Sequence, residues 1–190
     1  MNYARLEKTR VPDLAPVFGG ARGRTLSSKH LAYAWRALQE AGVTTVIDLR
    51  EQDKSERLPI LCKEYGMRYF HYPVDNASAV IEQMITLFPD FCQLIDGGNF
   101  YIACAMGLHR TDIALCTYWV FYGADKGLEP PTIRGYRKED GHNTNKLMRI
   151  LNALYQAFSD REGIAPMTEL EFKQRKNIIL QQANSSVDIV

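Results

Sequence analysis

The sequence predicts an α/β fold built on a central, mostly parallel sheet. Short runs of β-branched and aromatic residues alternate with longer segments whose apolar residues recur at helical spacing. Glycine or proline separates most of these segments. A chain in which helices and strands alternate folds most simply as βα units around a parallel sheet. At 190 residues it is long enough for one well-buried core and short for two.

The chain is expected to form one domain with an addition at each end. Residues 1–26 are predicted as an irregular lead-in, because prolines and glycines crowd the stretch Val11–Thr25. Residues 27–160 are expected to hold the main fold. Residues 161–190 are predicted as a C-terminal helix and tail that pack on the same domain.

The chain as far as Tyr72 predicts two helices and two strands. A helix is expected to begin near Ser27, with Ser27 or Ser28 as its cap, and to end before Gly42. The β-branched run Val43–Leu49 predicts a strand buried on both faces. A short helix over Leu58–Tyr65 and a strand over Met67–Tyr72 follow.

The rest of the chain predicts one more strand and four more helices. The strand is expected over Asn99–Ala103. The helices are expected over Val80–Ile95 with a bend at Pro89, from Thr111 to about Tyr122, from a cap at Asn143 or Asn145, and over Thr168–Gln182.

Charge and composition narrow the class of function. Lys and Arg number 23 against 22 for Asp and Glu, so no long-range field would attract nucleic acid or an anionic membrane. The N-terminus lacks an apolar signal and no window approaches eighteen apolar residues, so a cytoplasmic protein without membrane insertion is expected. The cysteines lack metal-ligand spacing, so free thiols and no metal or cofactor are expected. No feature sets an oligomeric state.

The segment Cys104–Arg110 is the strongest candidate for chemistry. It follows a predicted strand and precedes a helix, so its backbone N–H groups can curl around an anion. That positive field favours the thiolate form of Cys104, and the planar guanidinium of Arg110 can hold two phosphate oxygens. The expected phosphate-binding residues are Cys104, Ala105, Met106, Gly107, Leu108, His109 and Arg110.

Two further side chains are expected to complete the catalytic set. Thr111 can donate its hydroxyl to the sulfur of Cys104, which makes the sulfur a better leaving group when water attacks a phosphocysteine. Asp75, in a loop after a strand, is expected to protonate the leaving oxygen. Parallel strands end at one edge of a sheet, so both loops are expected to meet there. Asp48, inside a strand, is expected to be structural.

The chain resembles the dual-specificity branch of the protein tyrosine phosphatase superfamily. Cys104, Gly107, Arg110 and Thr111 match its pattern Cys-x-x-Gly-x-x-Arg-Ser/Thr, and the order of elements agrees over roughly residues 44–154. The resemblance implies a sheet of four or five strands flanked by helices, a phosphocysteine intermediate and no metal. It also implies a phosphorylated protein or small molecule as substrate.

Departures from the family pattern keep other functions open. Ala103 stands where the family usually has a His that organises the loop, and Asp112 places negative charge near an anion site. His109 is expected to be a surface residue without a catalytic role. One alternative is therefore a phosphatase-like module that binds phosphate but turns it over poorly. Another is a sulfurtransferase or arsenate reductase, neither of which needs an acid placed like Asp75.

Overall fold

The computed structural model describes residues 1–2, 4, 14–26, 32–51, 57–136, 144–161 and 167–185. The chain divides into two compact units. The first comprises Met1–Val74 and Leu87–Thr111, and the second comprises Asp75–Thr86 and Asp112–Val190. The predicted domain boundaries at residues 26 and 160 stay a prediction.

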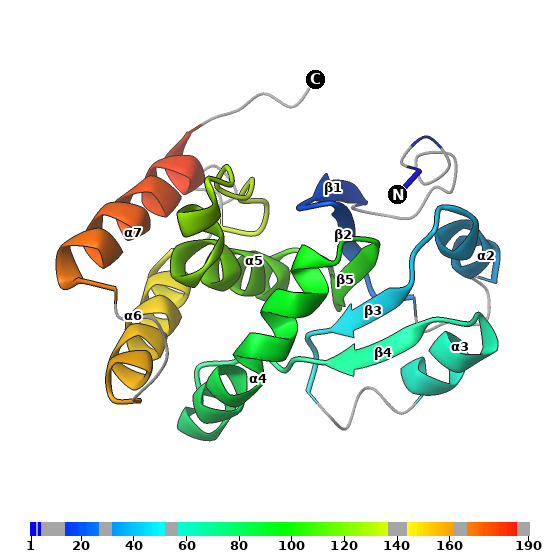
Figure 1. Ribbon diagram of the computed structural model, residues 1–190, viewed down its shortest axis with the longest axis horizontal. Helices are drawn as coiled ribbons and strands as arrows, with labels where there is room; N and C mark the ends of the chain where they lie inside the picture. Colours follow the sequence, from blue (N-terminus) through cyan, green and yellow to red (C-terminus); the bar gives the residue numbers. More distant parts are fainter. Residues whose placement is uncertain are drawn as a thin grey trace. The chain divides into compact units, whose positions relative to one another are not determined.

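The first unit is built on a five-stranded sheet with the strand order β1-β2-β5-β3-β4 (Figure 1). The strands are β1 (Ala15–Val17), β2 (Gly20–Arg24), β3 (Thr45–Asp48), β4 (Arg68–His71) and β5 (Phe100–Cys104). β1 pairs with β2 in antiparallel orientation, whereas β2–β5, β5–β3 and β3–β4 are parallel. The predicted α/β class and mostly parallel sheet are confirmed.

The prediction of an irregular lead-in was wrong where β1 and β2 form. The glycines that suggested a chain break allow β2 to lie against the aromatic residues of β5. A Cβ atom on Gly20 would lie 2.5 Å from the ring of Phe100, and one on Gly23 would overlap the hydroxyl of Tyr101. Glycine in a strand can therefore mark a close approach rather than a loop.

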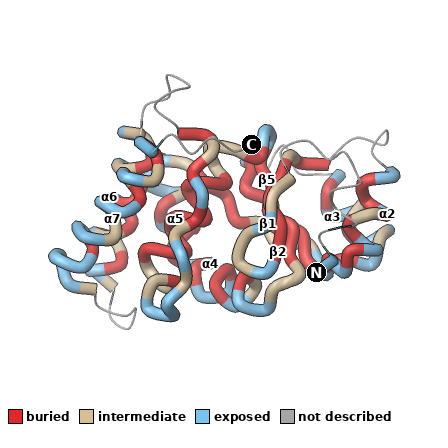
Figure 2. The backbone as a smooth tube through the Cα atoms, turned by 90° about the horizontal axis from the view of Figure 1, so that it is seen from above, coloured by how far each residue is buried: buried red, intermediate tan, exposed pale blue. Residues whose placement is uncertain are grey.

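Two helices contribute to a core in the first unit. Side chains from α2 (Ala32–Glu40) and α3 (Leu58–Glu64) form one buried cluster with residues of β2, β3 and β5. Trp35 of α2 donates its indole N–H to the carbonyl oxygen of Leu26 at 2.8 Å. The expected helix start at Ser27 lies outside the described residues. In Figure 2, β2 and β5 are buried along most of their length.

Two long helices have residues in both units. They are α4 (Ser78–Asp96) and α5 (His109–Phe121). Pro89 lies inside α4 without ending it. Among the described residues, no helix is both long and apolar enough to cross a membrane.

The second unit also contains η3 (Gly123–Lys126), α6 (Asn145–Ser159) and α7 (Glu169–Asn184). The residues predicted to share the apolar face of α6 are all buried: Leu147, Ile150, Leu151, Leu154 and Phe158. Thr144 rather than Asn145 occupies the N-cap position of α6, and Asn143 lies outside the described residues. Thr168 and Glu171 cap the start of α7 reciprocally, as a capping box.

Candidate active site

The parallel strands end together at the carboxyl edge of the sheet in the first unit. Cys104, the last residue of β5, pairs in register with Arg24, the last residue of β2. On the other side of β5, Asp48 at the end of β3 is opposite Ala103 and also pairs with His71 of β4. Side chains far apart in the sequence therefore surround the start of the β5–α5 loop.

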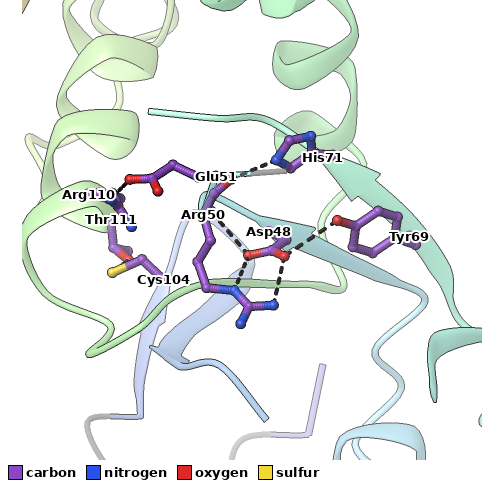
Figure 3. A network of polar contacts seen from close by, with 8 residues as sticks. All are labelled: Asp48, Arg50, Glu51, Tyr69, His71, Cys104, Arg110 and Thr111. Carbon is purple, nitrogen blue, oxygen red and sulfur yellow. Dashed lines mark hydrogen bonds and ion pairs between the residues drawn. The ribbon is translucent and has the colours of Figure 1, made fainter. Parts of the chain in front are cut away.

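Cys104, Arg110 and Thr111 come together as the sequence predicts. The hydroxyl of Thr111 donates a hydrogen bond to Sγ of Cys104 at 3.4 Å (Figure 3). Both residues are buried. The helix begins at His109, two residues before the predicted start, so Arg110 lies in its first turn. A thiol at a strand end thus lies beside a helix N-terminus, which is an electropositive position.

The loop between Cys104 and α5 is held in a tight turn. The backbone N–H of Gly107 donates to the carbonyl oxygen of Cys104 at 3.3 Å, and Gly107 has a φ of +70°. The Gly107 amide was expected to join the anion-binding set, but here it closes this turn. Ala105 and Met106 are exposed, whereas Leu108 and His109 are partly buried.

Arg110 is paired with a carboxylate. Its Nη2 atom lies 2.8 Å from Oε1 of Glu51, and the two side chains are 24% and 47% exposed (Figure 3). A phosphate oxygen would seek the same guanidinium donors. Glu51 could not be singled out from the sequence, because nothing local to a residue just after a strand shows which cation it will meet.

A buried ion pair supports the segment that carries Glu51. Arg50 contacts the carboxylate of Asp48 through two nitrogens, Nε and Nη2, each at 3.0 Å. From β4, the hydroxyl of Tyr69 donates to Asp48 at 3.4 Å, and Nε2 of His71 lies 2.6 Å from the carbonyl oxygen of Arg50 (Figure 3). Asp48, which was expected to be structural, thus forms a buried ion pair at the end of β3.

β2 contacts the loop from the other side of β5. Nη2 of Arg22 donates to the carbonyl oxygens of Gly107 at 3.0 Å and Leu108 at 3.3 Å. A Cβ atom on Gly107 would lie 2.5 Å from the carbonyl oxygen of Gly23 and 2.8 Å from the backbone nitrogen of Arg24. Arg22 and its neighbours in β2 were not expected at the site, because the glycines of this segment suggested a chain break. An arginine between two small residues, Ala21 and Gly23, was the available signal.

Asp112 was expected to place negative charge near an anion site, and in the structure backbone hydrogen bonds hold its carboxylate. Within the second unit, its Oδ2 atom accepts hydrogen bonds from the backbone N–H groups of Arg134 at 3.0 Å and Gly135 at 2.6 Å. Hydrogen bonds from two amides compensate the charge of a buried carboxylate. Asp112 therefore anchors a backbone turn.

Asp75 belongs to the second unit, whereas Cys104 belongs to the first. The Asp75 carboxylate accepts a hydrogen bond from the backbone N–H of Asn76 at 2.6 Å, and Nζ of Lys146 lies 4.0 Å from its other oxygen. The expected meeting of Asp75 and Cys104 stays a prediction.

The other cysteines are buried free thiols. They are Cys62, Cys92 and Cys116. Burial, together with the charge of Asp48, raises the pKa of Cys62 to about 12, so this thiol stays protonated near neutral pH. In the part of the chain that the structure describes, no group of three or more His, Cys, Asp or Glu residues could hold a metal ion.

One comparison with a solved structure supports the fold. The structure of P. aeruginosa TpbA in complex with pTyr matches with a TM-score of 0.51 at 13% identity, over 93% of this chain and 93% of that chain. The Yvh1 phosphatase domain from Chaetomium thermophilum matches with a TM-score of 0.41 at 16% identity, over 90% of this chain and 98% of that chain. A search of curated proteins finds no match.

A family model covers four of the five strands together with the β5–α5 loop. The model described as "Polymorphic toxin system, DSP-PTPase phosphatase" matches residues 20–124, which is more than half of the chain. The matched region begins at β2 and includes Cys104, Arg110 and Thr111. The chain therefore belongs to the DSP-PTPase phosphatase family of polymorphic toxin systems.

Proposed function

We propose that the chain hydrolyses a phosphate monoester with Cys104 as the nucleophile. The observation that carries the proposal is the hydrogen bond from the hydroxyl of Thr111 to Sγ of Cys104, with Arg110 in the adjacent first turn of α5. A hydroxyl that donates to sulfur stabilises a thiolate, and the helix N-terminus adds a positive field. Membership of a phosphatase family supports the same chemistry.

In the first step, the sulfur of Cys104 attacks phosphorus. An S–P bond forms while the bond from phosphorus to the ester oxygen breaks, and Asp75 gives its proton to that leaving oxygen. The guanidinium of Arg110 and the loop amides other than that of Gly107, whose N–H is bonded within the loop, hold the equatorial oxygens, where charge is spread in the transition state. The phosphate must displace Glu51 from Arg110 or share the guanidinium with it.

In the second step, the phosphocysteine is hydrolysed. The Asp75 carboxylate accepts a proton from a water molecule whose oxygen attacks phosphorus, and the S–P bond breaks. The hydroxyl of Thr111 donates to the departing sulfur and lowers the cost of the returning thiolate. Orthophosphate leaves, and the enzyme regains a protonated Asp75 and a thiolate.

One of the two observations that favoured a phosphate-binding module with poor turnover no longer supports it. It rested on Ala103 and on the charge of Asp112, and the carboxylate of Asp112 is occupied by two backbone amides. We therefore favour the enzyme. A phosphorylated protein or small molecule is the proposed substrate class, and phosphotyrosine is a suitable first test because the structural neighbour TpbA is recorded in complex with it.

The test of the nucleophile is hydrolysis of p-nitrophenyl phosphate without added metal. We expect Cys104→Ser to abolish turnover and Cys92→Ser, which alters an equally buried cysteine, to retain it; both residues are 4% exposed. Capture of a phosphocysteine on Cys104 after rapid quenching would support the mechanism directly. Wild-type turnover in Cys104→Ser would contradict it.

The test of the acid uses two leaving groups. p-Nitrophenolate leaves without much protonation, whereas an alkoxide from an alkyl phosphate needs a proton. Asp75→Asn should therefore lose about 100-fold or more in kcat with the alkyl ester and far less with the aryl ester. Asp160→Asn, which changes an exposed carboxylate of the same unit, is the control. An equal effect of Asp75→Asn on both esters would exclude the acid role.

A further inference from the structure

We infer that Arg22 is a positioning residue that holds the phosphate-binding loop in its anion-accepting shape. The inference rests on the proposed function, since it assigns a further residue to the same site. It is carried by a contact between β2 and the loop that spans 85 residues of sequence. Arg22 is only 2% exposed, so the structure buries a permanent charge behind this loop.

The hydrogen bonds of Arg22 fix which way the loop backbone faces. A loop that turns N–H groups toward an anion turns carbonyl groups toward the opposite side, where each buried oxygen needs a donor. Nη2 of Arg22 supplies that donor to Gly107 at 3.0 Å and to Leu108 at 3.3 Å. These two residues lie immediately before the first turn of α5, which carries Arg110. A shift of their carbonyls would move the Arg110 backbone with them.

The backbone of β2 keeps Arg22 in place. The N–H of Thr25 donates to the carbonyl oxygen of Cys104 at 2.9 Å, which continues the pairing of β2 with β5 to the first residue of the loop. The hydroxyl of Tyr101 donates to the carbonyl oxygen of Arg24 at 2.6 Å. Gly107 lies against the backbone of Gly23 and Arg24. The loop is therefore packed on β2 by backbone and side chain together.

An arginine suits this position better than other residues. Its charge opposes the negative ends of two carbonyl dipoles, and its planar group presents several N–H donors in a fixed geometry. Lysine could reach one carbonyl but would hold it with a mobile ammonium. Ala103, which precedes the nucleophile and pairs in register with Gly23, offers the loop no side-chain donor. Arg22 supplies from the neighbouring strand the support that position 103 lacks.

The test compares Arg22→Met and Arg22→Lys with Arg175→Met. Arg175 also donates to a backbone carbonyl, that of Val120 at 2.7 Å, but it belongs to the second unit and lies outside the proposed machinery. Calorimetry measures the affinity for orthovanadate. Hydrolysis of p-nitrophenyl phosphate gives kcat and KM, and the midpoint of urea denaturation reports the stability of the folded state. Because small displacements of a site cost up to about 100-fold, Arg22→Met should weaken vanadate binding and lower kcat/KM by about 10-fold to 100-fold.

The vanadate affinity and kcat/KM of Arg22→Lys should lie between those of wild type and Arg22→Met. Arg175→Met should lower only the urea midpoint. Vanadate affinity and kcat/KM within twofold of wild type in a folded Arg22→Met protein would overturn the inference. If Arg22→Met does not fold, Arg22→Lys decides, and wild-type vanadate affinity in that variant overturns it. A wild-type protein that binds vanadate without turnover would refute the proposed function, while weaker vanadate binding in Arg22→Met would still support the role of Arg22.

Discussion

The two strands that flank β5 support its loop in different ways. β2 contacts the loop backbone through Arg22, which is 2% exposed, and through the close approach of Gly23 to Gly107. On the other side, Glu51, which follows β3, pairs with Arg110 in the first turn of α5, and the side chains of Glu51 and Arg110 are 47% and 24% exposed. One flank therefore holds the main chain from the buried side, and the other holds a side chain near solvent.

The two flanks therefore control different properties of the site: the β2 flank controls the shape of the loop backbone, and the β3 flank controls the charge around Arg110. Hydrogen bonds to buried carbonyls are costly to lose, because the oxygen is left without a partner. A half-exposed ion pair contributes little to stability, but it can compete for a guanidinium that must bind phosphate. We therefore expect changes on the β2 flank to alter oxyanion binding through loop geometry. Changes on the β3 flank should alter either overall stability, at Asp48, or ionic competition, at Glu51.

The largest expected effect on stability comes from the buried pair on the β3 flank. Asp48→Asn leaves the charge of Arg50 without its ionic partner, and breaking a buried ion pair typically costs about 3–5 kcal/mol of unfolding free energy. Urea denaturation measures the loss, with Asp160→Asn as an exposed control. Vanadate affinity of the folded variant should stay within a few-fold of wild type. A selective loss of vanadate affinity at unchanged stability would show that the β3 flank also shapes the loop.

A glycine pair isolates the contact between the loop and β2. Gly107 and Gly127 have nearly equal φ angles, +70° and +71°, but only Gly107 has backbone atoms where a Cβ atom would lie. Alanine at either position carries the cost of a left-handed conformation, about 1 kcal/mol, and Gly107→Ala adds an overpacking cost of about 1–3 kcal/mol.

We expect Gly107→Ala to weaken vanadate binding by at least about tenfold, because the loop must move away from β2. Gly127→Ala should leave vanadate binding unchanged. Calorimetry and urea denaturation of both variants measure the difference. Equal stabilities and equal vanadate affinities in the two variants would show that the close approach of Gly107 to β2 does not matter for the loop.

A smaller effect is expected from a single hydroxyl of β5 that contacts β2. Tyr101→Phe removes the hydrogen bond to the carbonyl oxygen of Arg24 at 2.6 Å and should cost about 1 kcal/mol of unfolding free energy. Tyr69→Phe removes the longer contact to Asp48 on the β3 flank, at 3.4 Å, and should cost less. Thermal or urea unfolding ranks the two. The reverse order would mean that β4 supports the site more strongly than β2 does.

The smallest change in free energy is expected at Glu51. Glu51→Gln removes the anion that competes for Arg110, and an exposed pair of this kind is worth at most about 1 kcal/mol, so vanadate affinity should rise about twofold to fivefold. The gain should shrink at high salt, because screening weakens the wild-type pair. Glu82→Gln removes a similar exposed pair, with Arg161 at 2.8 Å, and should leave vanadate affinity unchanged. Weaker binding in Glu51→Gln would instead mean that Glu51 holds Arg110 in position.

Most of the fold could be predicted because it depends on local patterns. β3 and β4 lie within the predicted segments, β5 extends one residue beyond its predicted end at Ala103, and the predicted face of α6 is the buried one. β1 and β2 were missed because their glycines resemble a loop when their partners on β5 are unknown. The hydrogen-bond partners of the Asp112 carboxylate could not be predicted for a similar reason, since its two amide donors come from residues 134 and 135.

The sequence by itself determined the order strand, loop and helix around Cys104, and with it the contact of Thr111 with the sulfur. Those features involve residues no more than seven positions apart in the sequence, so local propensity is sufficient. Only the tertiary structure decided that Arg22 and Glu51 meet this loop, because both contacts depend on how β2 and β3 pair with β5. Strand pairing is set by packing across long sequence separations, which no local pattern records.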